Sequence, residues 1–333
     1  MAEAEADKND SRHDPALEVA PGPHTSHGAL NTRRMMLDVI IALVPVIVVA
    51  LAVFRIYAVK QIVLCVVSCV AAEALFEAMR RRRPRIDNLS AVVTGLILAF
   101  SLPGAAPWYV AVVGSAAGIG LGKAVFGGLG QNIFNPAMVG RAFVMICFAS
   151  AMGSSAYQDA GSEVDAITQA TPLTAMEQTG EAASLTKLFV GNTNGSLGET
   201  SALACLLGGL YLLVRRSAAW QIPAGVLLGT ALLAALQNIL NPEAAWTVAH
   251  HLLGGALLFG AFYIATDPVS SPLTPKGRFI FGLGVGALVM LLRVFSGYPE
   301  GVMFAVLLMN SVTPLINRWT IPRPVGGPVQ QNA

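Results

Sequence analysis

The amino-acid sequence predicts an all-α polytopic membrane protein with about ten transmembrane helices, arranged as two inverted five-helix repeats. Of its 333 residues, 54% are hydrophobic and only 12% are charged, whereas a soluble domain carries roughly 25% charged residues. The mean hydropathy is +0.62. Because so little polar surface cannot cover a globule in water, the lipid bilayer is the expected solvent of most of the chain.

Residues 1–34 form a polar N-terminal arm that differs from the rest of the chain. The arm is too poor in apolar residues to fold alone, so we expect it to be disordered. It contains no apolar core of the signal-peptide type, so we expect no cleavage.

Ten apolar runs between polar breaks are candidates for spanning helices, which need about 20 residues and can be as short as about 17. The third and fourth runs are short and are flanked by Pro and Gly. The ten runs cover residues 37–57, 61–79, 89–103, 108–124, 134–152, 199–214, 219–239, 246–264, 279–295 and 301–317.

The distribution of basic residues predicts the orientation in the membrane, because cytoplasmic loops carry an excess of Lys and Arg. Seventeen of the 21 basic residues fall on one side of the ten runs, including the run Arg80–Arg83. The other side receives Arg55, Lys60, Lys187 and Arg293. We therefore expect both termini, including the tail 319–333, to be cytoplasmic, and residues 153–198 to form an outer, periplasmic loop.

Five apolar runs precede the outer loop and five follow it. The first half spans residues 35–152 and the second spans residues 199–318. An odd number of helices in each half requires that the halves, if they are repeats, are inverted. Interrupted segments fit that design: Gly127 to Pro136 in the first half and Thr266 to Pro275 in the second. We find no convincing similarity between the halves at the level of residues.

Composition and motifs exclude several classes of function. The net charge is +2, and no basic stripe with interleaved aromatic residues is present, so we expect no nucleic-acid partner. The four cysteines sit in apolar runs, lack a C-x-x-C pattern and have no clustered His or carboxylate, so we expect no metal site. The run Gly127–Gly130 lies between membrane helices rather than in a βαβ unit, which excludes a dinucleotide fingerprint.

The outer loop, residues 153–198, is the stretch most suggestive of function. Loops of this length are usually functional or disordered. Thr171 precedes a proline, which favours an extended backbone and presents the threonine hydroxyl to a modifying enzyme.

The segment Asp165-Ala-Ile-Thr168-Gln169-Ala170-Thr171 resembles the motif at which flavin transferases attach FMN through a phosphoester to the final threonine. Asp165, Thr168 and Ala170 match the motif, and Gln169 stands where glycine is usual. Around it, residues 35–318 resemble, in order, the family that contains the D subunit of the bacterial Rnf complex and the B subunit of the sodium-pumping NADH:quinone oxidoreductase. The matching segments are Gly122–Ala137, Gly195–Ser201, Ala265–Pro272 and Tyr298 to Asn310.

The resemblance implies a membrane subunit of a redox-driven, ion-translocating complex of the ferredoxin:NAD type in a bacterial inner membrane. It implies covalent FMN on Thr171, electron transfer between partner subunits of an Rnf-type complex, and a flavin transferase as a further partner. Family members are also associated with a second, non-covalent riboflavin, whose residues the sequence does not assign.

We expect the outer end of the sixth apolar run to hold the flavin. Gly195, Ser196, Glu199 and Thr200 stand where that helix begins, and the N–H groups of a helix N-terminus attract anions. These groups are therefore expected to stabilise the flavin phosphate or a reduced, anionic isoalloxazine.

Ionisable residues inside the apolar runs are few. Glu73 and Glu77 share a face of the second apolar run, and Arg80 and Arg81 follow Glu77 at the spacing of a surface ion pair. No carboxylate is placed at the centre of a predicted helix, so no proton or sodium relay is expected within this chain.

Three alternatives remain open. The B subunit of the quinone oxidoreductase shares the fold and the flavin but usually has a longer N-terminal extension. A solute channel or transporter is compatible with inverted five-helix repeats, although Asn135-Pro136-Ala137 lacks the second such triplet of water channels, because Asn241-Pro242 is followed by Glu243. A scaffold protein without a redox role is the third alternative.

Overall fold

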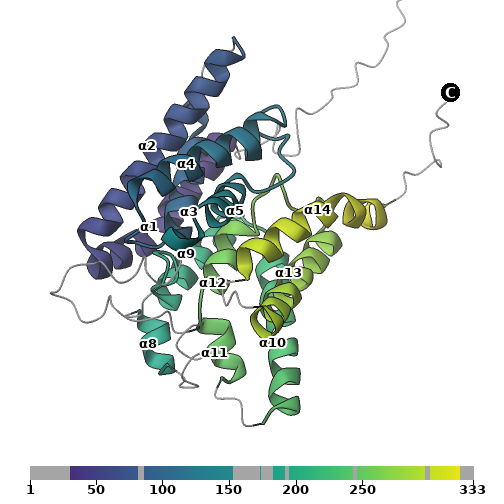
Figure 1. Cartoon of the computed structure of the whole chain (residues 1–333). Helices are drawn as coiled ribbons and strands as arrows, with labels where there is room; N and C mark the ends of the chain where they lie inside the picture. The colour runs from purple at the N-terminus through teal and green to yellow at the C-terminus, as the bar shows by residue number, and fades with distance from the viewer. Residues whose placement is uncertain are drawn as a thin grey trace, which may run out of the picture.

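The computed structural model describes residues 31–81, 86–152, 173, 183–191, 195–242, 246–296 and 301–322. All regular structure in these residues is helical (Figure 1), and one isolated bridge joins Pro103 to Ser196. The prediction of an all-helical chain is confirmed for this part of the protein.

The first half of the chain begins with two long helices, α1 and α2. They are separated only by Arg55, whose φ of 49° turns the chain back on itself. The helices of this half are α1 (Thr32–Phe54), α2 (Ile56–Met79), the short 3-10 helix η1 (Ile86–Asn88), α3 (Ser90–Ser101), α4 (Trp108–Ile119), the π-helical stretch η2 (Gly120–Ala124), α5 (Pro136–Cys147) and α6 (Ala149–Met152).

The second half has the same kinds of element, with more interruptions. After the short helix α8 (Leu185–Val190), the chain forms α9 (Ala202–Val214), α10 (Gln221–Leu240), α11 (Val248–Leu253), α12 (Leu257–Phe259), the π-helical stretch η4 (Gly260–Ile264), α13 (Pro275–Phe295) and α14 (Val302–Thr320).

Four of these helices, α1, α2, α10 and α13, are long and apolar enough to cross a membrane by length and composition. The helices α3, α5 and α9 are shorter apolar helices. Each of the ten predicted runs overlaps helical structure, but several overlap helices that are too short to span on their own. The chain is therefore a polytopic membrane protein, and ten crossings stay a prediction.

Packing follows a similar order in the two halves. In the first half, α2 packs against α3 and α4, and α4 packs against α5. In the second half, α10 packs against α11 and α13, and α13 packs against α14. The halves meet where α1 packs against α9. This shared order supports a repeat but does not test its inversion.

The tightest packing uses glycine faces, because lipid gives helices no hydrophobic reason to associate and close backbone contact must hold them together. Between α10 and α13, a Cβ on Gly225 would lie 2.6 Å from the Phe279 carbonyl oxygen, and one on Gly229 would lie 2.5 Å from that of Leu283. Between α4 and α5, a Cβ on Gly118 would lie 2.7 Å from the Pro136 carbonyl oxygen.

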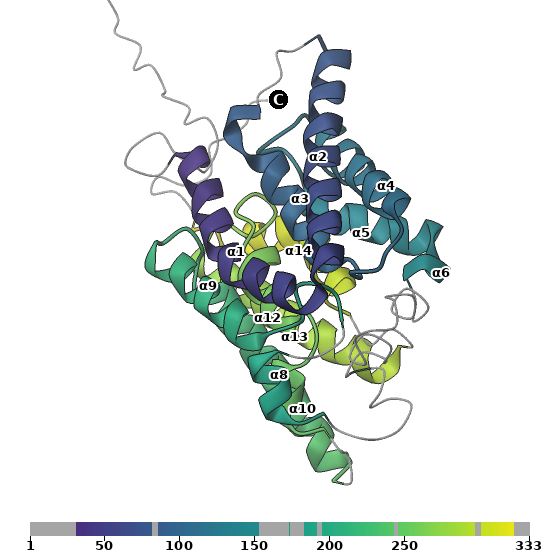
Figure 2. The same cartoon turned by 90° about the vertical axis from the view of Figure 1, so that its left-hand side faces the viewer.

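Helix α8 and the C-terminal end of α2 lie at opposite ends of the molecule (Figures 1 and 2). In both views, the C-terminal end of α2, which leads into the basic run, lies at the top. The helix α8 and the C-terminal end of α10 lie toward the bottom. The helix α8 and the C-terminal end of α2 are therefore at opposite ends of the helical body.

Substituting Gly286→Ala in α13 tests the glycine packing. Its Cβ would overlap the backbone carbonyl oxygen of Val226 in α10, so we expect a loss of about 1–3 kcal/mol of stability, as for other overpacked sites. The control is Gly284→Ala on the same helix, whose Cβ would meet only the flexible end of Met309. Thermal unfolding in nanodiscs should show a clearly lower midpoint for the first variant alone, and equal midpoints would contradict the packing argument.

Candidate functional site

The predicted flavin attachment motif lies outside the described residues. This holds for Asp165, Thr168, Ala170 and the acceptor Thr171. Modification of Thr171 therefore stays a prediction, and the neighbouring described residues supply the geometry of this region.

The segment Gly195–Ser201 forms a buried turn against the C-terminal end of α3, rather than an exposed loop. Its Ser196 and Thr200 side chains are 1% and 2% exposed. The Ser196 hydroxyl donates to the Glu199 carboxylate at 2.5 Å, and the Thr200 hydroxyl donates to the Leu197 carbonyl at 3.0 Å. These contacts fold the segment onto itself just before α9.

The structure narrows the predicted role of this segment in binding an anion. Helix α9 begins at Ala202, three residues later than the predicted start, and the Ser201 hydroxyl accepts the Ala204 N–H at 3.3 Å as its N-cap. The N–H groups of Leu197 and Gly198 donate to carbonyl oxygens at the end of α3, and that of Glu199 donates to Ser196. Those three N–H groups are therefore committed within the protein and cannot also bind a flavin phosphate.

Two described pieces of the outer loop lie against α11 and the glycines that follow it. Leu173 is 6% exposed, and a Cβ added to Gly255 would lie 2.6 Å from its Cδ1 atom. Helix α8 packs against α11, and the Ala183 carbonyl lies 3.2 Å from His250 Nε2. The predicted attachment segment therefore leads directly into a residue that is docked on the helical body.

Beside Leu173 lies a group of side chains that we call the outer cluster: Trp246, His250, His251 and Arg293. The Trp246 ring is fully buried and makes ring contacts with both histidines, with centroids 5.7 and 5.2 Å apart. The Arg293 guanidinium donates to the His251 carbonyl at 2.6 Å and to the Gly254 carbonyl at 2.8 Å. Arg293 thus ties the end of α13 to the end of α11, where the helix stops and its carbonyls need donors.

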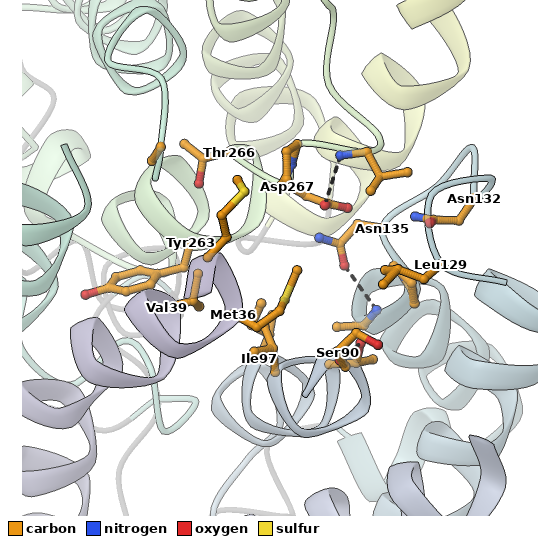
Figure 3. Close-up of a pocket in the computed structure, with 18 of the residues that line it drawn as sticks. Met36, Val39, Ser90, Ile97, Leu129, Asn132, Asn135, Tyr263, Thr266 and Asp267 are labelled. Carbon is orange, nitrogen blue, oxygen red and sulfur yellow. Dashed lines mark hydrogen bonds between the residues drawn. The ribbon is translucent and has the colours of Figure 1, made fainter. Parts of the chain in front are cut away.

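At the other end of the molecule, a pocket opens between the two halves (Figure 3). It has a volume of about 770 Å³, counting the part that opens to solvent. Its labelled walls come from α1 (Met36, Val39), α3 (Ser90, Ile97), the segment before α5 (Leu129, Asn132, Asn135), and η4 with the turn after it (Tyr263, Thr266, Asp267). We call this the inner pocket.

Asn135 and Asn310 hold the broken backbone around the inner pocket. Asn135 accepts the N–H of Ala137 with its side-chain oxygen at 3.0 Å and donates its amide to the Ile264 carbonyl at 3.3 Å. Asn310 of α14 accepts the Asn135 N–H at 3.2 Å and donates to the Ser270 carbonyl at 3.1 Å. The two interrupted segments predicted from the sequence, one in each half, are thus joined through these asparagines.

A buried ion pair borders the inner pocket, and the sequence reasoning missed it. Lys123 of η2 contacts the Glu73 carboxylate and the Ser90 hydroxyl, each at 2.6 Å. Lys123 and Glu73 are 4% and 5% exposed. The sequence grouped Glu73 with the surface charges near Glu77, but a charge inside an apolar helix is a functional or paired group by default. Lys123 could have indicated the pair, because it is a basic residue within the apolar run 108–124 and therefore needs an acidic partner such as Glu73.

A second buried carboxylate, Asp38 of α1, joins the halves. It is 3% exposed and accepts hydrogen bonds from Ser217 at 2.5 Å, Tyr211 at 3.3 Å and Arg215 at 3.3 Å. Together with Glu73 it shows that carboxylates do lie within the helical body. Within the described residues, no group of three or more His, Cys, Asp or Glu side chains could hold a metal ion.

The fold and these sites define a class: polytopic membrane proteins with interrupted helices and buried polar groups at the breaks. The chain belongs to the NQR2, RnfD, RnfE family, whose pattern matches residues 18–326. The resemblance expected from the sequence is confirmed at the level of the family.

Relatives cover nearly the whole chain. The D subunit of the Na(+)-translocating ferredoxin:NAD(+) oxidoreductase complex of Acetobacterium woodii is 42% identical over 314 residues, 93% of this chain and 95% of that protein. The D subunit of the proton-translocating ferredoxin:NAD(+) oxidoreductase complex of Clostridium ljungdahlii is 38% identical over 343 residues, covering 98% and 99%. The D subunit of the ion-translocating oxidoreductase complex of Stutzerimonas stutzeri is 41% identical over 325 residues, covering 88% and 92%.

Substituting Glu73→Gln tests the buried ion pair. The change leaves the Lys123 charge buried without its carboxylate, so we expect a loss of about 3–5 kcal/mol of stability. Replacing both partners, as Glu73→Leu with Lys123→Met, should recover most of that loss. Asp87→Asn at an exposed position is the control, with an expected change within about 0.5 kcal/mol. Chemical unfolding of the wild type and the three variants provides the measurement, and a double variant that is no more stable than Glu73→Gln would argue against the pair.

Proposed function

We propose that this chain is a membrane subunit of a redox-driven, ion-translocating complex of the ferredoxin:NAD type, and that it carries FMN covalently on Thr171. The single observation that carries the proposal is the near-complete match to relatives named as the D subunits of such complexes, combined with the motif from Asp165 to Thr171. The FMN supplies electron transfer when bound, and the protein supplies its placement and surroundings.

The proposed topology has ten crossings of a bacterial inner membrane in two inverted repeats, with both termini cytoplasmic and the loop 153–198 periplasmic. The positions of α8 and of the C-terminal end of α2 at opposite ends of the molecule support this orientation (Figures 1 and 2). In this arrangement the outer cluster faces the periplasm and the inner pocket faces the cytoplasm.

The inner pocket fits a second, non-covalent flavin of riboflavin type. Its empty space of about 770 Å³ includes the part that opens to solvent, so the lining of the pocket, rather than its volume, supports a ligand here. Met36, Val39 and Ile97 offer an apolar wall for a flat ring, and Ser90 and Asn132 place polar atoms at its rim. A few polar groups in an otherwise apolar cavity are the usual means of orienting a ligand.

The proposed partners are the other subunits of an Rnf-type complex, which deliver electrons to this chain and accept them from it, and a flavin transferase, which modifies Thr171. The B subunit of a sodium-pumping quinone oxidoreductase is the second candidate, because the family that matches the chain contains both types. Reduction by ferredoxin in the purified complex would favour the first candidate, and reduction of quinone by NADH would favour the second.

Thr171→Ala is the direct test of covalent attachment. The variant lacks the hydroxyl that forms the phosphoester, so co-expression with a flavin transferase should give no flavin fluorescence in the denatured protein on a gel. Thr174→Ala, a second threonine of the same loop, is the matched control and should fluoresce like the wild type. Fluorescence that persists in the Thr171 variant would place the flavin elsewhere.

Val269→Trp tests the inner pocket. Val269 lines the pocket and is half-buried, so an indole there should occupy the space of a bound ring. We expect roughly tenfold weaker retention of non-covalent flavin, equivalent to about 1.4 kcal/mol. The control is Val125→Trp, at a residue that is 67% exposed. Acid extraction of the purified proteins, followed by chromatography, measures the released riboflavin, and equal amounts from both variants would argue against this location.

A further inference from the structure

Lys123 and Glu73 lie between the inner pocket and a second cavity. Lys123 lines both of them, Ser90 lines the inner pocket, and Glu73 lines the second cavity. The second cavity follows the C-terminal part of α2, where its walls also include the half-buried Glu77 and the exposed Arg80. The buried ion pair therefore separates the pocket proposed to hold a flavin from a cavity that reaches the surface.

Two contacts hold Lys123 in the wall of the inner pocket. Its Nζ atom donates to Glu73 Oε1 and to Ser90 Oγ, each at 2.6 Å, and the Ser90 hydroxyl donates in turn to the Asn88 side-chain oxygen at 2.8 Å. An ammonium group has three N–H donors. Within the described residues, Lys123 uses two of them, so the third is available to a ligand in the inner pocket.

The Glu73 carboxylate contacts Lys123 through one of its oxygens. The other, Oε2, is buried and has no hydrogen-bond partner in the part of the chain that the structure describes. Glu73 as a whole is 5% exposed. Buried polar atoms nearly always have a partner, and one without a protein partner calls for an ordered water. Since Glu73 lines the second cavity, a water molecule in that cavity can fill this role and exchange protons with the carboxylate.

The position of Lys123 depends on a π-helical stretch. Residues Gly120–Ala124 form η2, and such wide helical turns are rare and are frequently found at functional sites. The second half brings Tyr263 to the inner pocket from its own π-helical stretch, η4. The Tyr263 hydroxyl donates to the Ala42 carbonyl at 3.0 Å, so its proton is committed to the backbone. Of these two residues, Lys123 is the one with a proton to give to a ligand.

We propose that Glu73 and Lys123 form a proton relay, which carries protons from water in the second cavity to the flavin ring in the inner pocket when that ring is reduced. The inference rests on the proposed non-covalent flavin and adds how this chain balances its charge. Negative charge in an apolar body is costly, so electrons that reach the inner pocket need protons to follow them. Ionisable side chains inside membrane proteins commonly form such relays.

The transfer balances in protons and electrons. Two electrons come from the redox partner subunits of the complex and add negative charge at a ring nitrogen in the inner pocket. The Lys123 ammonium gives one proton to that nitrogen, so an N–H bond forms there and the lysine becomes a neutral amine. A hydronium ion in the second cavity protonates Glu73 at Oε2, and the carboxyl group turns and passes its proton to the amine, which restores the 2.6 Å contact. One proton has then moved from the cavity to the ring.

A purely structural ion pair makes a different prediction, and Lys123→Arg separates the two roles. Arginine keeps the positive charge and carries donors for Glu73 and Ser90, but it is not deprotonated in proteins. If the pair only holds α2 and η2 together, the arginine variant should protonate the reduced ring as fast as the wild type. If Lys123 donates the proton, the variant should be slow although its charge is unchanged.

The experiment follows the non-covalent flavin in protein that is expressed without a flavin transferase and held in nanodiscs. A chemical reductant supplies electrons in a stopped-flow instrument, and absorbance distinguishes the anionic from the protonated reduced ring. In the wild type we expect a protonation rate that changes little with pH, because Lys123 holds the proton in place. In Lys123→Arg we expect a rate at least about tenfold lower, which falls further as the pH rises, because the proton must then come from bulk hydronium. The matched control is Lys60→Arg at an exposed residue, which should behave like the wild type.

A second variant tests the cavity and leaves both members of the ion pair unchanged. Ala124 lines the second cavity and is not among the walls of the inner pocket, so Ala124→Leu should hinder water from reaching Glu73. We expect slower proton uptake from the medium during reduction, recorded with a pH-indicator dye. The control is Val125→Leu, at the adjacent residue, which is 67% exposed and should take up protons at the wild-type rate.

Acid extraction first shows whether each protein carries the non-covalent flavin. Its absence from the wild type would overturn the proposed flavin in the inner pocket together with this inference. Flavin that is present in all proteins, with wild-type protonation in Lys123→Arg and wild-type proton uptake in Ala124→Leu, would overturn this inference alone. If Lys123→Arg does not fold or does not retain flavin, the comparison of Ala124→Leu with Val125→Leu decides: slower uptake in the first supports the relay, and equal uptake contradicts it.

Discussion

The structure depends on one constraint: a backbone that leaves helical geometry inside an apolar body must find other hydrogen-bond partners, because lipid offers none. Helices are interrupted at both ends of the molecule, and backbone groups at each interruption form hydrogen bonds with another segment of the chain. The Leu197 and Gly198 N–H groups donate to the end of α3. At the opposite end, Asn135 and Asn310 connect the segment before α5 with the turn after η4. Irregular backbone is tolerated in membrane proteins where it lines a cavity or is enclosed by protein, and that is where both candidate sites lie.

The two sites are built in different ways from this constraint. The inner pocket lies between the interrupted segments of the two halves, and short polar side chains line its rim (Figure 3). At the outer cluster, the carbonyl oxygens where α11 ends accept hydrogen bonds from the half-buried Arg293. The glycine faces support both arrangements. Close contact of α10 with α13 and of α4 with α5 holds the helices around the interrupted segments in place.

Much of the helical architecture could be predicted from the sequence, because apolar runs of spanning length are a direct consequence of the lipid solvent. The positions of α1, α2, α10 and α13 followed from that pattern. The start of α9 at Ala202 could not be predicted, because the turn before it is held by the end of α3, which is distant in the chain. The Glu73–Lys123 pair was missed because the partners are 50 residues apart and each was judged on its own helix. Leu173 carries no signal in sequence at all, since its significance comes from Gly255 and Arg293, which are distant in the chain.

The interruption between α11 and α12 explains why Leu173 packs where it does. A continuous helix through Gly254 and Gly255 would satisfy its own carbonyls and would present side chains, not backbone, to the loop. The break instead exposes the carbonyls of His251 and Gly254, which Arg293 then binds, and it leaves at Gly255 a surface without a side chain on which Leu173 rests. Any Cβ at Gly255 would collide with the leucine and crowd the guanidinium. The two glycines at this break therefore expose the carbonyls that Arg293 binds and leave the surface on which Leu173 rests.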